Sequence, residues 1–139
     1  MKLIFRTFFL TLFRLFVIMT ILIALQNFDF SPLPEWTAIV VAYLAHFGVT
    51  WFFAAWAFWK QYPSTRDVVT VSVIFLVIGT ALEAGLYFVL NPYGTLQGLL
   101  HNYQWQSLII VAIYLAAILF AAFRARTKQT PSIVEGIAS

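Results

Sequence analysis

Cysteine is absent from the 139-residue chain, and charged side chains are scarce. The lack of cysteine excludes disulfides, thiolate metal sites and thiol catalysis. Charged residues make up 9% of the sequence, compared with roughly 25% in a typical soluble domain. A water-soluble protein of this size could not cover its surface with so few charges. Because 63% of the residues are hydrophobic, we expect the chain to lie in a membrane.

Sequence motifs of known chemistry are also missing. The chain has no HExxH, no nucleophile elbow and no glycine-rich phosphate loop. Its two histidines, His46 and His101, are far apart in sequence, which does not indicate a metal or haem site. Asp29 and Glu35 form a carboxylate pair in a short loop, where solvation is the simplest interpretation. The sequence therefore implies no cofactor and no metal, and it favours a non-enzymatic protein.

Four long apolar stretches are present instead. A membrane-spanning helix needs about 20 mostly apolar residues, and short connections favour antiparallel neighbours. We therefore predict an all-α membrane protein in which residues 1–126 form a four-helix, up-down-up-down transmembrane bundle. Residues 127–139 are small or polar and are predicted to form a flexible cytoplasmic tail. The predicted spans cover residues 7–27, 37–59, 68–90 and 106–123.

The basic residues all fall on one side of this plan. The two connections at 26–36 and 91–106 carry no Lys or Arg. Such asymmetry sets orientation, so we predict a multi-pass protein of the cell (inner or plasma) membrane with both termini cytoplasmic. Topology also explains the pI near 9.5 without a nucleic-acid partner. The eight residues are Lys2, Arg6, Arg14, Lys60, Arg66, Arg124, Arg126 and Lys128.

Local signals mark the ends of the spans. Ser64-Thr65-Arg66-Asp67 resembles a capping box, in which Ser64 and Asp67 satisfy each other's backbone N–H groups. Asn91-Pro92-Tyr93-Gly94 is typical of a β-turn. Leu96, Leu99, Leu100 and Tyr103 recur at helical spacing, which predicts a short helix on the outer membrane surface.

Each span contributes one hydrogen-bonding side chain at a similar depth: Thr20, His46, Glu83 and Tyr114. At a rise of about 1.5 Å per residue, His46 lies about 13 Å and Glu83 about 10 Å below the outer surface. Ionisable groups at this depth are costly and are candidates for function. Three interpretations stay open: a proton or cation site, hydrogen bonds that hold the bundle together, and a contact with a partner subunit.

Arg14 is a further candidate, either for an ion pair or for snorkelling. If the first span begins at residue 7, Arg14 lies about 10 Å inside the cytoplasmic edge, and its stem can reach back to the headgroups. Alternatively, residues 1–12 form a separate helix on the membrane surface. A pair between Arg14 and Glu83 would need a long reach between their layers.

Aromatic residues gather near the end of the second span. Trp51, Trp56 and Trp59 are expected to contact lipid and the membrane interface, where such residues are enriched. They could also receive a partner helix, a quinone or a pigment. Small residues in the second, third and fourth spans permit close helix packing, a signal shared by most polytopic proteins.

The leading functional hypothesis is an accessory or structural subunit of a larger membrane assembly. The second is a homo-oligomeric small transporter or channel that uses Glu83 and His46. The third is a membrane enzyme or cofactor binder that also uses Tyr114. The expected partners are the lipid bilayer and either other membrane subunits or further copies of the chain.

Overall fold

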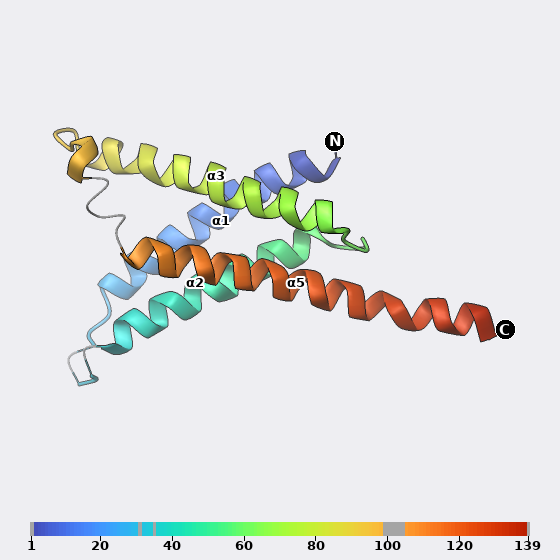
Figure 1. The fold of residues 1–139 in the computed structure, drawn as a ribbon. Helices are drawn as coiled ribbons and strands as arrows, with labels where there is room; N and C mark the ends of the chain where they lie inside the picture. The colour runs from blue at the N-terminus through green and yellow to red at the C-terminus, as the bar shows by residue number, and fades with distance from the viewer. Residues whose placement is uncertain (1, 31, 35, 99–104, 139) are drawn as a thin grey trace.

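The fold is built from four long helices. The computed structural model describes residues 2–30, 32–34, 36–98 and 105–138, and no strand occurs in these ranges. All four helices are long and apolar enough to cross a membrane, as the composition predicts. The all-α prediction is therefore confirmed. The helices are α1 (Lys2–Gln26), α2 (Trp36–Ala57), α3 (Thr65–Leu90) and α5 (Trp105–Ala138) (Figure 1).

Two helices extend beyond the predicted spans. α1 begins at Lys2 and continues to Gln26, so residues 2–12 do not form a separate helix. α5 continues to Ala138, through the segment predicted as a tail. Hydropathy marks where a helix can lie in lipid, but it does not determine where the helix ends beyond the lipid. That residues 127–139 are mobile and cytoplasmic stays a prediction.

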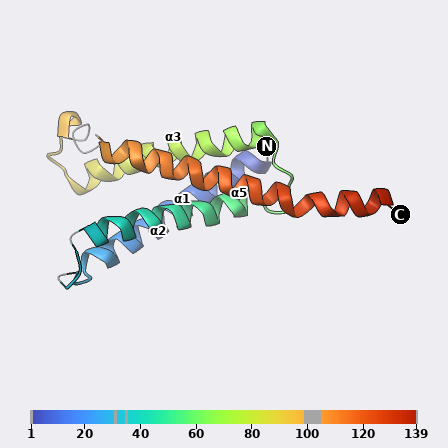
Figure 2. The same ribbon diagram turned by 60° about the horizontal axis from the view of Figure 1, so that its bottom comes forward.

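The four helices form a bundle in which consecutive helices are not always neighbours. α2 packs against α1 and α5, and α3 also packs against α1 and α5, so α2 and α3 occupy opposite corners (Figures 1 and 2). The expectation that short connections join neighbouring helices is wrong for this pair. An extended chain spans about 3.3 Å per residue, so residues 58–64 are long enough to cross the bundle.

The predicted capping box begins α3. The Ser64 N–H donates to Asp67 Oδ2 at 2.9 Å, and the Asp67 N–H donates to Ser64 Oγ at 3.2 Å. The predicted turn is also present, because the Gly94 N–H donates to the Asn91 carbonyl at 2.8 Å. Residues 96–98 are helical. The rest of the predicted surface helix, including Leu99, Leu100 and Tyr103, lies outside the described residues.

Buried side chains are confined to one half of the bundle and its middle. The core lies near the α2–α3 connection, where alanines of α2 and α5 and the rings of Phe58 and Phe75 are buried. Toward the opposite end, the α1–α2 pair diverges from the α3–α5 pair (Figure 2). Among described side chains, none in 19–26, 36–45, 80–98 and 108–113 is buried. We call these two regions the packed half and the open half.

Candidate functional site

Arg14 lies at the centre of the bundle. Twelve residues of α1 precede it and twelve follow it, and its side chain is 0% exposed. The snorkelling interpretation therefore does not describe this side chain, which points inward. A helix that begins at Lys2 places Arg14 in the middle of α1, away from either end.

One guanidinium group contacts the other three helices. Arg14 Nη1 donates to Thr50 Oγ1 of α2 at 3.4 Å, and Nη2 donates to the Phe75 carbonyl of α3 at 3.3 Å. Its Cζ atom lies 4.3 Å from the centre of the Tyr114 ring of α5 and 5.1 Å from that of Phe75. Cations over aromatic faces are attracted by the ring quadrupole, more strongly when water is excluded.

Gly79 provides the space for this contact. Its N–H is the helical partner of the Phe75 carbonyl, four residues earlier, so the two groups lie on the same face of α3. A Cβ atom at position 79 would lie 2.5 Å from Arg14 Nη2 and 3.7 Å from Cζ. Any larger residue would therefore collide with the guanidinium. The same atom added at Gly48 or Gly85 would meet nothing within 4 Å.

His46 and Tyr114 form a second contact in the same region. A hydrogen bond joins the Tyr114 hydroxyl and His46 Nδ1 at 3.1 Å, and both side chains are buried. His46 is at mid-helix, with ten residues of α2 before it and eleven after it. The structure therefore brings these two predicted site residues together. Tyr114 links them to Arg14, because its ring faces the guanidinium.

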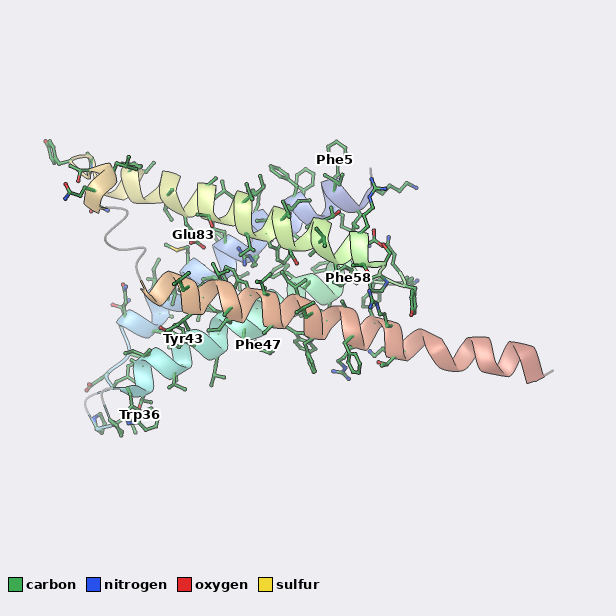
Figure 3. The ribbon with its side chains drawn as sticks, in the orientation of Figure 1. Phe5, Trp36, Tyr43, Phe47, Phe58 and Glu83 are labelled. Carbon is green, nitrogen blue, oxygen red and sulfur yellow. The ribbon has the colours of Figure 1, made fainter. Side chains whose placement is uncertain are left out.

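Glu83 lies close enough to interact electrostatically with Arg14 and with Tyr114. Its side chain is half-buried and lies on the part of α3 that looks into the bundle (Figure 3). The expected separation between the layers of Arg14 and Glu83 was based on a first helix that starts at residue 7. Because α1 begins at Lys2, the two residues are close enough to interact. We refer to Arg14, His46, Glu83 and Tyr114 as the polar centre.

Thr20 is not part of the polar centre, although it was predicted to share its layer. Its side chain is exposed, and its hydroxyl donates to the Phe16 carbonyl of its own helix at 2.9 Å. Thr20 follows Arg14 by six residues, which is about 240° around a helix. Thr20 therefore lies on a different face of α1 from Arg14, which an estimate of depth alone could not reveal.

The three tryptophans near the end of α2 have different surroundings. Trp51 is half-buried and packs against the core, and the centroids of its ring and the Phe120 ring lie 6.4 Å apart. Trp56 and Trp59 are 49% and 61% exposed. Contact with lipid or a partner is therefore open to Trp56 and Trp59, while Trp51 has a structural role as well.

Thr50, Phe75 and Gly79 are members of the site that the sequence interpretation missed. A signal for them existed on α3, because residues 75, 79 and 83 recur at intervals of four and share one helix face. A glycine one turn before an intramembrane carboxylate suggests a close approach by another group. Thr50, one turn after His46, lies on the same face of α2 in the same way.

The polar centre can hold charge and protons inside the bundle. It combines a guanidinium, a carboxyl group, an imidazole and a phenol, all within side-chain or electrostatic contact. No group of three or more His, Cys, Asp or Glu among the described residues could hold a metal ion. No model of a known protein family, no curated protein and no solved structure matches the chain.

Proposed function

We propose that this chain is a small, non-enzymatic, multi-pass protein of the cell membrane that acts as an accessory or structural subunit of a larger membrane assembly. In this proposal the bundle is up-down-up-down and both termini face the cytoplasm. The orientation is supported by the eight basic residues, which avoid the 27–35 and 91–98 ends of the helices.

The open half is the observation that carries the proposal. Along one end of each span, no described side chain is buried within the chain itself. Membrane helices associate through close packing, and here the α1–α2 and α3–α5 pairs leave their apolar surfaces without such packing. A helix from another subunit would complete the packing of this half.

The polar centre fits a structural role within this proposal. It lies where the helices begin to diverge, and it connects all four of them through Arg14 and the Tyr114–His46 hydrogen bond. Interhelical polar contacts in membranes average about 0.6 kcal/mol each, so several acting on one side chain can fix the angle between helix pairs.

A second candidate is a homo-oligomeric small transporter or channel that uses Glu83 and His46. The half-buried position of Glu83 favours it, since this carboxyl group lies on the open-half side of the buried Arg14. In a homo-oligomer, the open halves of several copies would face each other and bring their Glu83 side chains to a shared interior.

Native mass spectrometry of the full chain, extracted gently from its host, tests both candidates. The subunit proposal expects a complex with other polypeptides at a fixed ratio. Integer multiples of the 15.9 kDa chain alone would favour the transporter, and Glu83→Gln should then abolish pH-dependent flux. A monomer in several mild detergents would contradict both candidates.

A photocrosslinking experiment locates the contact. A crosslinker at Leu86 lies in the open half, one turn after Glu83, whereas the matched position Val69 is exposed in the packed half of the same helix. We expect protein crosslinks from Leu86 and lipid crosslinks from Val69. Equal protein capture from both positions would argue against the open half as the interface.

A further inference from the structure

A groove lies between the C-terminal part of α2 and the polar end of α5, away from the polar centre. Its volume is about 620 Å³, within the roughly 300–1,000 Å³ of sites that bind small molecules. Ala121 and Ala125 of α5 leave room on one side, and the rings of Trp56 and Trp59 stand on the other. One part of the groove is therefore apolar and aromatic.

The other part of the groove is strongly basic. Lys60, Arg124 and Lys128 line it, and its described lining includes no acidic side chain. Arg124 and Lys128 are four residues apart and therefore share one face of α5. Lys60 reaches the same place from the end of α2, where its φ of 57° turns the chain out of the helix.

Arg126 shows that this arrangement is not a general property of the basic segment. Its Nε–H donates to the Pro63 carbonyl at 2.9 Å, on the other side of α5 from the groove. Of the three cations that follow the fourth span, two therefore line the groove and one attaches α5 to the α2–α3 connection. Arg124 and Lys128 are both exposed.

We infer that this groove binds an anionic phospholipid. The headgroup phosphate lies among Lys60, Arg124 and Lys128, and one acyl chain runs along Trp56 and the alanines of α5. The apolar part of the groove matches the acyl chain of such a lipid, and its cationic end is opposite in charge to the phosphate. The basic end of the bundle is also where the positive-inside rule places the anionic cytoplasmic leaflet. This inference does not depend on the subunit proposal.

Quenching of tryptophan fluorescence tests the inference with the full chain in phosphatidylcholine vesicles. Phosphatidylglycerol or phosphatidylcholine with brominated chains is added at increasing mole fractions, because bromine quenches nearby indoles. A cation in contact with an anionic headgroup contributes roughly a fivefold preference for that lipid. We therefore expect half-maximal quenching at a phosphatidylglycerol fraction at least tenfold below that of phosphatidylcholine.

A charge-matched pair of variants distinguishes lipid binding in the groove from a general electrostatic attraction between the protein and anionic lipid. Arg124→Gln/Lys128→Gln removes two groove cations and should lose most of the preference. Lys2→Gln/Arg66→Gln removes two exposed cations outside the groove and should retain it. Equal losses in the two variants, or no preference in the unaltered chain, would overturn the inference. If the groove variant fails to fold, Lys128→Gln against Arg66→Gln gives the same comparison, with about a fivefold change.

Competition identifies the source of the phosphate. Inorganic phosphate at millimolar concentration should not relieve the quenching, because it lacks the chain that contacts Trp56. Relief by inorganic phosphate would show a simple anion site and overturn the lipid assignment. Native mass spectrometry with the same two lipids provides an independent count of bound molecules, and an adduct with phosphatidylglycerol but not phosphatidylcholine is expected.

Discussion

The packed half and the open half of the bundle are made from the same four helices, yet only one is closed by the chain itself. In the packed half, Ala54 and Ala57 of α2 and Ala117 and Ala121 of α5 are at most 2% exposed. In the open half, the helices of the two pairs separate and their apolar residues stay accessible. High hydrophobicity alone therefore does not close a membrane bundle, because facing helices must also pack closely against each other.

The polar centre lies at the boundary between these halves. Its cation, Arg14, has different surroundings from the cations at the basic end of the bundle, which we define as the end with the α2–α3 connection. Arg14 is enclosed by groups from three other helices, whereas Arg66 at the basic end is exposed. A cation far from water needs internal partners, while a cation at the membrane surface has solvent and headgroups. The comparison predicts large effects in the middle and small ones at the end.

The largest effect is expected for Arg14→Met, which removes the cation and leaves the nearby carboxyl group of Glu83 uncompensated. Breaking a buried charge interaction costs roughly 3–5 kcal/mol, and we expect about 3 kcal/mol because Glu83 is half-buried. Unfolding in mixed micelles measures the change, and the control Arg66→Met should stay within about 0.5 kcal/mol. Adding Glu83→Leu to Arg14→Met should recover part of the loss, and equal losses for Arg14→Met and Arg66→Met would contradict the enclosed cation.

Gly79→Ala should have the next largest effect, a loss of about 1–3 kcal/mol in the free energy of unfolding, because the new methyl group collides with the Arg14 guanidinium. Gly48→Ala and Gly85→Ala are matched controls with free space around the added atom. Because alanine is the better helix former, both controls should be neutral or stabilising by up to about 1 kcal/mol. If all three variants behave alike, Arg14 does not depend on the space at Gly79.

Ser64→Ala tests the packed half, at the start of α3. It should lower the free energy of unfolding by about 1 kcal/mol, because the first turn of α3 loses its cap. The control Ser64→Thr keeps an acceptor oxygen and should lose less. The measurement is the same micelle titration. A loss as large as that of Arg14→Met would remove the contrast between the middle and the end.

The sequence was sufficient for the features that depend on local chemistry. The four spans follow from apolar length, the start of α3 from Ser64 and Asp67, and the turn after α3 from Asn91 and Gly94. Each of these depends on residues only a few positions apart. His46, Glu83 and Tyr114 could also be identified, because polar groups within apolar spans are conspicuous.

What the sequence could not provide was direction around each helix and the order of helices in the bundle. Arg14 was expected near the beginning of the first helix because hydropathy set the start at residue 7, whereas the helix begins at Lys2. Thr20 was included because depth carries no information about which face a residue occupies. The diagonal arrangement of α2 and α3 depends on contacts far apart in the chain, those of α1 and of α5 with both helices.

The corner positions of the helices also have a consequence for synthesis. α1, α2 and α3 leave the ribosome first, and α1 can pack with each of the other two while the last helix is still being made. At that stage Arg14 has Thr50 and the Phe75 carbonyl but no aromatic ring from α5. Arrival of α5 supplies Tyr114 and joins α2 to α3. A chain truncated before Trp105 lacks α5 and should therefore stay open to quality-control proteases, whereas the full chain should become resistant once α5 has entered the membrane.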